Sequence, residues 1–166
     1  MNKHVKVLFV CMGNICRSPS GEGVFRHYVA AAGYGDTILV DSAGIIDYHA
    51  GDPADRRMRE VASRRGYTLT SIARQVTVED ITDFDLIVAM DRDNLTALEL
   101  LANGTCDHIR MLGTFLDGTA SNATARAVPD PYYGGTAGFE AVLDMIEKAC
   151  PAMLTHSLEL LQAKSG

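Results

Sequence analysis

Apolar residues follow two alternating spacings along this chain. A nearly continuous apolar run extends from Val5 to Val10, which is typical of a strand buried on both faces. Apolar residues then recur at helical spacing from Val24 to Ala32, and Gly33 ends that helix. The alternation continues, with further strands expected at 37–41, 85–90 and 108–112 and further helices at 52–66, 91–102 and from about 136 onward. It predicts one α/β domain over residues 1–166, a four-stranded parallel sheet with helices on both faces.

Capping residues, prolines and turn formers indicate where the expected helices and loops begin and end. Asp52 is the expected N-cap of the helix that follows, with Pro53 at its first position. Residues 42–51 are rich in turn formers and are expected to be a loop, and one helical turn is expected near Glu79. Residues 113–135 are expected to form a long loop, which inside a compact domain is usually functional. The apolar face of the last helix continues past Pro151, which predicts one kinked helix rather than two.

The segment between the first strand and the first helix carries the strongest chemical signal. Cys11 ends the strand, and Arg17 and Ser18 follow after five residues at the start of the helix. A loop of this length can turn its backbone N–H groups inward as an anion cradle, to which the helix N-terminus adds positive potential. Gly13 and Asn14 readily adopt the left-handed backbone that such a loop needs. The planar guanidinium of Arg17 can bind two phosphate oxygens at once. Hydrogen-bond donors around Cys11 favour its thiolate over its thiol. The pattern therefore indicates a thiolate nucleophile beneath a bound phosphoryl group.

Two further observations place this site in the expected fold. Parallel sheets bind ligands beyond the carboxyl ends of their strands, and Cys11, Ser42 and Asp91 all stand at such ends. The chain has neither a Gly-x-Gly-x-x-Gly nor a Gly-x-x-x-x-Gly-Lys segment, so the two common nucleotide loops of this fold class are missing.

A second candidate constellation lies in the long loop. Asp130 stands between Pro129 and Pro131, which stiffen its backbone, and it could protonate the oxygen that leaves when a thiolate attacks a phosphate ester. Tyr132 and Tyr133 follow directly and could form the walls of a slot for an aromatic ring.

Composition and net charge limit the binding partners that we expect for this protein. The net charge of −6 argues against nucleic acid or an anionic membrane, and no apolar run is long enough to span a bilayer. The four cysteines form neither a disulfide framework nor a metal-ligand spacing, so we expect a reducing, cytoplasmic setting and no metal or cofactor. No secretory signal precedes the first strand.

The residues from Cys11 to Pro19, Cys-x-Gly-Asn-x-Cys-Arg-Ser-Pro, resemble the signature of the low-molecular-weight protein tyrosine phosphatases. The resemblance continues in order through 41–44, 73–75, 89–91 and 130–133. It implies hydrolysis of phosphotyrosine proteins or small aryl phosphates through a phosphocysteine, with release of inorganic phosphate. It also implies a monomer or weak dimer.

The resemblance also implies residue roles. Cys11 resembles the nucleophile, Arg17 the phosphate clamp, Asp130 the general acid and later base, and Ser18 the hydroxyl that eases thiolate departure. The phosphate loop is completed by Met12, Gly13, Asn14, Ile15 and Cys16. Ser42 resembles a support of Asn14, and Ser71 stands where members often have a histidine with that role. Met12, Ile15, Tyr48, Tyr132 and Tyr133 match the substrate slot, and Cys16 the partner in a reversible disulfide with Cys11. His49, beside Tyr48, is expected to be a solvated rim residue.

Three alternatives use the same loop. Arsenate reductases of this fold relay electrons through a further cysteine pair, and the wide sequence separation and apolar surroundings of Cys106 and Cys150 argue against that relay. Protein arginine phosphatases carry a threonine where this chain has Ile15, whose branched apolar side chain favours an aromatic ester. A non-catalytic phosphotyrosine-binding module would need neither Cys11 nor Asp130.

Overall fold

The computed structural model describes residues 3–116, 118 and 121–165. The strands are β1 (Val5–Cys11), β2 (Ile38–Gly44), β3 (Leu86–Ala89) and β4 (Ile109–Met111). The helices are α1 (Arg17–Ala31), α2 (Arg56–Arg64), α3 (Val78–Asp83), α4 (Arg92–Ala102) and α5 (Thr136–Ser165), with two 3-10 helices, η1 (Leu112–Phe115) and η2 (Asn122–Thr124).

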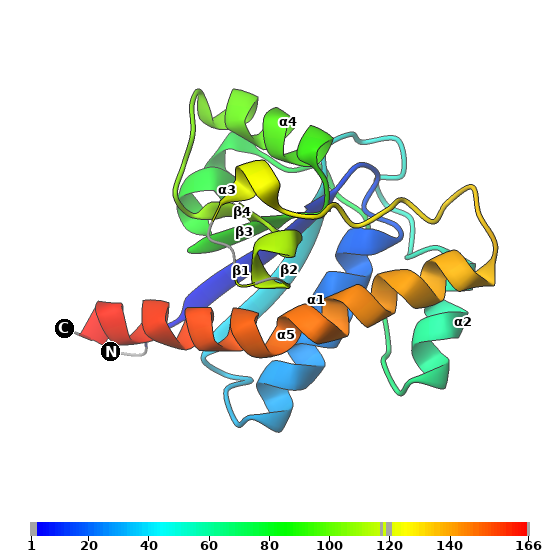
Figure 1. Cartoon of the computed structure of the whole chain (residues 1–166), viewed down its shortest axis with the longest axis horizontal. Helices are drawn as coiled ribbons and strands as arrows, with labels where there is room; N and C mark the ends of the chain where they lie inside the picture. The colour runs from blue at the N-terminus through cyan, green and yellow to red at the C-terminus, as the bar shows by residue number, and fades with distance from the viewer. Residues whose placement is uncertain (1–2, 117, 119–120, 166) are drawn as a thin grey trace.

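The strands form one parallel sheet in the order β2-β1-β3-β4. Alternate residues of β1 enter two different apolar clusters. Val7 and Phe9 face the cluster built with α1, α2 and α5, and Leu8 and Val10 face the cluster built with α3 and α4. Figure 1 shows this arrangement, with α4 above the sheet and α1 and α5 below it. The predicted fold class, a four-stranded parallel sheet covered on both faces, is confirmed.

Some predicted boundaries were wrong. The second helix begins at Arg56, not near Pro53, and its N-cap is Asp55, whose carboxylate accepts from the backbone N–H of Arg57 at 2.8 Å. Asp52 belongs instead to an extended stretch, because its carbonyl accepts from the Ala73 N–H at 2.8 Å and Pro53 pairs with Ile72. This long-range pairing excludes Asp52 as the cap.

Two other expectations change in part. The strand expected at 37–41 continues to Gly44, because its pairing with β1 runs to the end of both strands, so Ser42 lies in the sheet rather than in a loop. The long segment from 113 to 135 contains the end of η1 and all of η2. The helical turn expected near Glu79 is α3, and the last helix is continuous through Pro151.

Candidate active site

Cys11 and Arg17 mark the two ends of the predicted phosphate loop. Cys11 is the last residue of β1 and Arg17 the first of α1, and both are buried. Asn14, between them, has a φ of 58°, the left-handed conformation expected for this loop. The Cys11 Sγ lies 3.0 Å from the Ser18 hydroxyl and 3.4 Å from its backbone N–H. The sulfur therefore lies at the N-terminus of α1, where donors favour negative charge.

The side chain of Asn14 ties the loop to the sheet. Its Nδ2 donates to Ser18 Oγ at 2.8 Å and to Ser42 Oγ at 3.0 Å, and its Oδ1 accepts from the backbone N–H of Arg74 at 3.0 Å. These bonds use the full donor capacity of the amide and hold its orientation. Ser71, expected to help, makes no hydrogen bond to Asn14 among the residues that the structure describes. The third partner is the Arg74 backbone, which the sequence marked only as part of the segment 73–75.

Arg17 contacts two aspartates. Its Nη1 donates to Asp91 Oδ2 at 2.6 Å and to the Val128 carbonyl at 3.0 Å, and its Nη2 lies 3.6 Å from Asp130 Oδ2. Asp91 also caps α4, so its position is fixed by the helix it begins. Sequence reasoning placed Asp91 at the end of a strand without giving it a role. Its bond to Arg17 indicates that it orients the guanidinium.

A pocket of about 330 Å³ opens above Cys11. Its walls include every residue predicted for the substrate slot, namely Met12, Ile15, Tyr48, Tyr132 and Tyr133. Asp130 lines the same pocket, with its side chain 45% exposed, so it can reach a bound molecule. The Asp130 Oδ1 accepts from the Tyr132 N–H at 3.0 Å, a local turn that holds the carboxylate in place.

Two pocket residues differ from the sequence-based expectation. His49, predicted to be a solvated rim residue, lines the pocket; its ring centroid lies 4.8 Å from that of Tyr48, and its Nδ1 lies 3.5 Å from Asp52. Its ring also covers Gly13, where an added Cβ would come within 3.1 Å of the imidazole. Ile46 lines the pocket as well and was not singled out, although it stands only two residues before Tyr48.

The second loop cysteine is buried beside this pocket. Cys16 is a free thiol that precedes α1 and lines the pocket floor with Cys11. Burial raises the pKa of Cys16, and the negative charges of Asp55 and Cys11 raise it further. Its thiol is therefore held protonated at neutral pH, so Cys16 does not compete with Cys11 as a nucleophile.

The rest of the molecule adds two observations. Across the part of the chain that the structure describes, no three His, Cys, Asp or Glu side chains come together as a metal site. Among those same residues, no helix combines the length and apolar character needed to cross a bilayer.

Comparison with known proteins agrees with this geometry. Residues 6–164 match the family model described as low molecular weight phosphotyrosine protein phosphatase. The chain is 41% identical to the low molecular weight protein-tyrosine-phosphatase of Streptomyces coelicolor, over 97% of this chain and 98% of that protein.

Two solved structures have the same fold. YfkJ of Bacillus subtilis superposes with a TM-score of 0.85 at 38% identity, covering 95% of this chain and 96% of that one. DARP, the Drosophila arginine phosphatase, superposes with a TM-score of 0.82 at 33% identity, covering 92% and 97%. The family match extends over nearly the whole chain, and this chain belongs to the low molecular weight phosphotyrosine protein phosphatases.

Proposed function

We propose that this enzyme hydrolyses phosphotyrosine and related aryl phosphates through a covalent phosphocysteine on Cys11. The observation that carries the proposal is that Cys11, Arg17 and Asp130 line one pocket with aromatic walls. The phosphate would lie in the loop, bound by backbone N–H groups and by the guanidinium of Arg17. The aromatic ring would lie between Tyr48 and Tyr132, above Ile15.

The first chemical step is attack of the Cys11 thiolate on phosphorus. The P–O bond to the tyrosine breaks, and Asp130 gives its proton to the leaving phenolic oxygen. In the second step Asp130, now a carboxylate, takes a proton from a water that attacks the phosphocysteine, and inorganic phosphate and the Cys11 thiolate are released. The Ser18 hydroxyl, 3.0 Å from the sulfur, stabilises the departing thiolate.

The Cys11→Ser variant tests the nucleophile. A serine hydroxyl is almost entirely protonated at neutral pH, so turnover should be lost while the cradle still binds phosphate. Hydrolysis of an aryl phosphate is measured beside inorganic phosphate binding by calorimetry. An active Cys11→Ser enzyme would show that another residue attacks phosphorus.

A second candidate is hydrolysis of phosphoarginine. The similarity to DARP, which is named an arginine phosphatase, favours it, whereas the apolar Ile15 in the pocket wall favours a flat aromatic ester. Peptides carrying phosphotyrosine, phosphoarginine and phosphoserine, assayed in parallel, separate the candidates by their kcat/KM. A preference for phosphoarginine over phosphotyrosine would replace the proposed substrate class and leave the nucleophile unchanged.

A further inference from the structure

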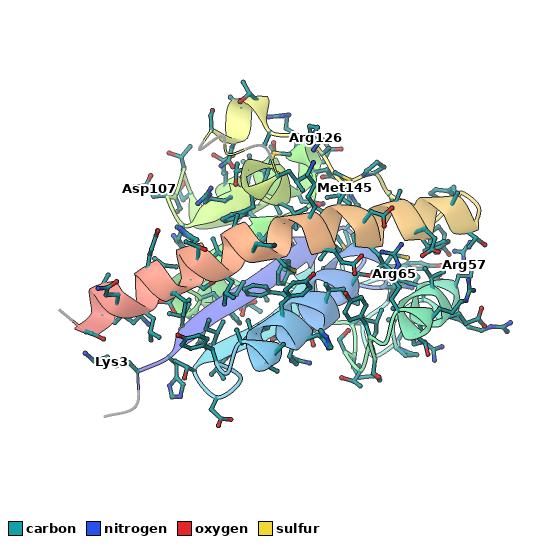
Figure 2. The ribbon with its side chains drawn as sticks, turned by 60° about the horizontal axis from the view of Figure 1, so that its bottom comes forward. Lys3, Arg57, Arg65, Asp107, Arg126 and Met145 are labelled. Carbon is teal, nitrogen blue, oxygen red and sulfur yellow. The ribbon has the colours of Figure 1, made fainter. Side chains whose placement is uncertain are left out.

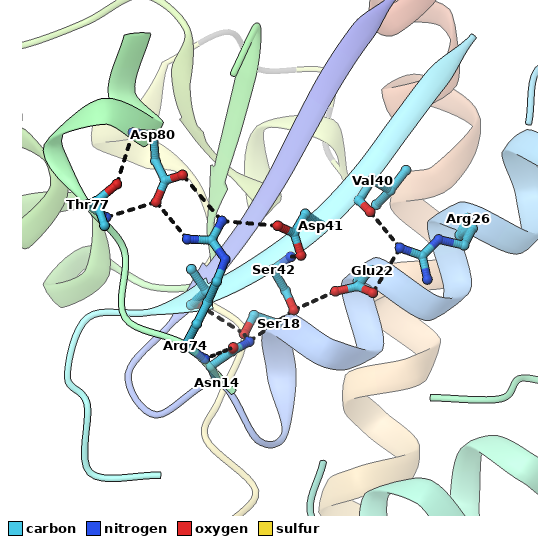
Figure 3. Close-up of polar contacts among 11 residues, drawn as sticks. Asn14, Ser18, Glu22, Arg26, Val40, Asp41, Ser42, Arg74, Thr77 and Asp80 are labelled. Carbon is cyan, nitrogen blue, oxygen red and sulfur yellow. Dashed lines mark hydrogen bonds and ion pairs between the residues drawn. The ribbon is translucent and has the colours of Figure 1, made fainter. Parts of the chain in front are cut away.

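A buried carboxylate that the mechanism does not use lies beneath the phosphate loop. Glu22, in the middle of α1, is 4% exposed. Its Oε2 lies 2.9 Å from Nη2 of Arg26, one helical turn later, and the same Nη2 donates to the Val40 carbonyl at 2.6 Å. Figure 3 shows Glu22 between this arginine and the polar residues of the loop. Burying a carboxylate costs free energy unless it is paired with a positive charge or hydrogen-bond donors. Its position beside the phosphate loop therefore indicates a role there.

A continuous chain of hydrogen bonds joins Glu22 to the sulfur of Cys11, and Figure 3 shows its part from Glu22 through Ser42 and Asn14 to Ser18. The Ser42 hydroxyl donates to Glu22 Oε1 at 2.7 Å. Asn14 Nδ2 donates to Ser42 Oγ at 3.0 Å and to Ser18 Oγ at 2.8 Å. Ser18 Oγ lies 3.0 Å from Cys11 Sγ.

The direction of each bond follows from the two ends of this chain. An ionised carboxylate can only accept, so the single proton of the Ser42 hydroxyl points to Glu22 and its oxygen accepts from Asn14. The Arg74 N–H, from which Asn14 Oδ1 accepts, favours the same orientation of the amide. Both Nδ2 protons are then used, and Ser18 Oγ accepts one of them.

The proton of Ser18 is thereby left for the sulfur. Its two available acceptors are Cys11 Sγ at 3.0 Å and the Ala43 carbonyl at 3.3 Å, and the sulfur is the nearer and, as a thiolate, the charged one. A hydroxyl that donates to sulfur stabilises the thiolate relative to the thiol. The Glu22 carboxylate, through Ser42, and the Arg74 N–H thus favour the same orientation of Asn14 and, through it, of the Ser18 hydroxyl.

We propose that Glu22 is a positioning residue whose carboxylate, acting through Ser42 and Asn14, makes Ser18 a hydrogen-bond donor to Cys11. The proposal deepens the proposed function, because it rests on Cys11 being the attacking thiolate. Glu22 itself does not touch the substrate pocket, whose lining residues do not include it.

The surroundings of Glu22 fit this role. Burial raises the pKa of Glu22 and the charge of Asp41 adds to the rise, while the Ser42 hydrogen bond and the Arg26 ion pair oppose it. Arg26 thus favours the ionised form, which accepts hydrogen bonds without donating any.

The test uses Glu22→Gln, which keeps the size of the side chain but can donate as well as accept. Ser42→Ala cuts the same chain one step later, and the double variant completes the cycle. Glu60→Gln is the matched control, since Glu60 pairs with Arg56 four residues earlier in an exposed ion pair on α2. The readout is the alkylation rate of Cys11 by iodoacetamide against pH, followed on the Cys11 peptide by mass spectrometry. That rate tracks the thiolate fraction and needs no phosphatase turnover.

We expect Glu22→Gln to move the midpoint of Cys11 alkylation upward by about one pH unit, which is about tenfold less thiolate below the midpoint. Ser42→Ala should give a similar shift, Glu60→Gln none, and the double variant no more than either single variant, because Glu22 acts through Ser42. Should Glu22→Gln fail to fold, Glu22→Asp takes its place, because the shorter carboxylate loses reach to the Ser42 hydroxyl but keeps its charge, and it should show the same upward shift.

An unmoved midpoint in Glu22→Gln, whatever Ser42→Ala shows, or shifts that add in the double variant, would overturn the proposal. The alkylation assay separates this failure from failure of the proposed function. The midpoint of Cys11 alkylation can shift even in an enzyme that has no phosphatase turnover. If a variant loses turnover and its alkylation midpoint does not shift, Glu22 has a merely structural role.

Discussion

Asp130 approaches the active site from a loop, whereas Arg17 and Asp91 are held at the starts of helices. Asp91 is fixed as the N-cap of α4, and Arg17 begins α1. Within the described part of the chain, Asp130 is tied by the turn to Tyr132 and by a 3.6 Å approach to Arg17. The difference matches their tasks. Arg17 must hold its geometry through both steps, whereas the general acid must meet a leaving oxygen and then a water.

Asp130→Asn should slow phosphotyrosine hydrolysis far more than hydrolysis of a strongly activated aryl phosphate. General acid catalysis contributes roughly 10²–10⁴-fold, and it matters most for a basic leaving group such as tyrosine, with a pKa of about 10. The comparison uses kcat/KM, which reports the steps through departure of the leaving group, and KM itself should change little. Equal losses for both esters would assign Asp130 a role other than proton donor, and Asp91 would be the next carboxylate to test.

Mild peroxide should inactivate the enzyme reversibly. It oxidises the Cys11 thiolate to a sulfenic acid, being reduced to water itself, and the Cys16 sulfur then displaces the hydroxyl to form a disulfide that thiol reductant reopens. Because burial raises the pKa of Cys16, the trapping step should become faster as pH rises.

The Cys16→Ala variant is the control for that disulfide. It should lose activity to peroxide irreversibly, with sulfinic acid on Cys11 in the mass spectrum. Sulfinic acid as the sole product in the unmodified enzyme would remove Cys16 from any protective role.

At the scale of elements, α1 contains two glycines, which are poor helix formers, and each lets the helix pack closely, Gly21 against the sheet and Gly23 against the segment that carries Leu69. A Cβ at Gly21 would lie 2.5 Å from the ring of Phe9 on β1, and one at Gly23 would lie 2.4 Å from Leu69. Phe9 is fully buried and packs edge-on against Phe25 of the same helix, with ring centroids 5.9 Å apart. The lack of space for a side chain at these two positions explains why glycines stand in a helix interior, where each costs about 1 kcal/mol relative to alanine.

Gly21→Ala should therefore destabilise the protein. The helix would gain about 1 kcal/mol in propensity, but overpacking a filled core typically costs about 1–3 kcal/mol, and Phe9 has no room to move away. Gly138→Ala, in the first turn of α5, is the matched control, because its Cβ would meet nothing closer than 3.5 Å. Urea denaturation compares the two variants, and a Gly21→Ala protein as stable as Gly138→Ala would show that the sheet can yield at this position.

Helix α2 and the start of α5 are joined by Arg65, which directly follows α2 and pairs with Glu140, Asp144 and Glu147. Figure 2 labels Arg65 and Arg57 beside these two helices. Nearby, Arg57 donates to the Tyr132 carbonyl at 3.0 Å, so α2 also braces the loop that carries the acid. Arg57 and Arg65 thus contact residues distant in the sequence, which helical spacing alone could not reveal.

For the whole molecule, the sequence was most informative where local pattern and topology coincide. The carboxyl ends of parallel strands meet at one edge, so Cys11, Ser42 and Asp91 were expected together, and their side chains lie in or beside one hydrogen-bonded site. The expectations that failed depended on contacts between distant segments. Pairing of 52–53 with 72–73 moved the start of α2, and the packing of His49 onto Gly13 brought a residue expected at the rim into the pocket wall.

Global stability should fall as pH drops from about 7.5 to about 5.5, in part through His156 on α5. Burial lowers the pKa of His156, and the Arg110 guanidinium, 3.5 Å from its Nδ1, lowers it further, while Glu159 opposes both. A histidine whose pKa is lower in the folded state takes up its proton more readily when the chain unfolds. Its stabilising contribution is therefore complete above the unfolded pKa of about 6.5 and is lost as pH falls toward the folded value.

His156→Phe keeps a ring beside Phe115, whose centroid lies 5.7 Å away, and removes the titration. Its free energy of unfolding should change less steeply with pH than that of the unmodified enzyme, by up to about one bound proton in slope. Urea denaturation at a series of pH values measures both slopes. Parallel slopes would mean that His156 is equally protonated in the folded and unfolded chains, and the acid sensitivity would then belong to the carboxylates.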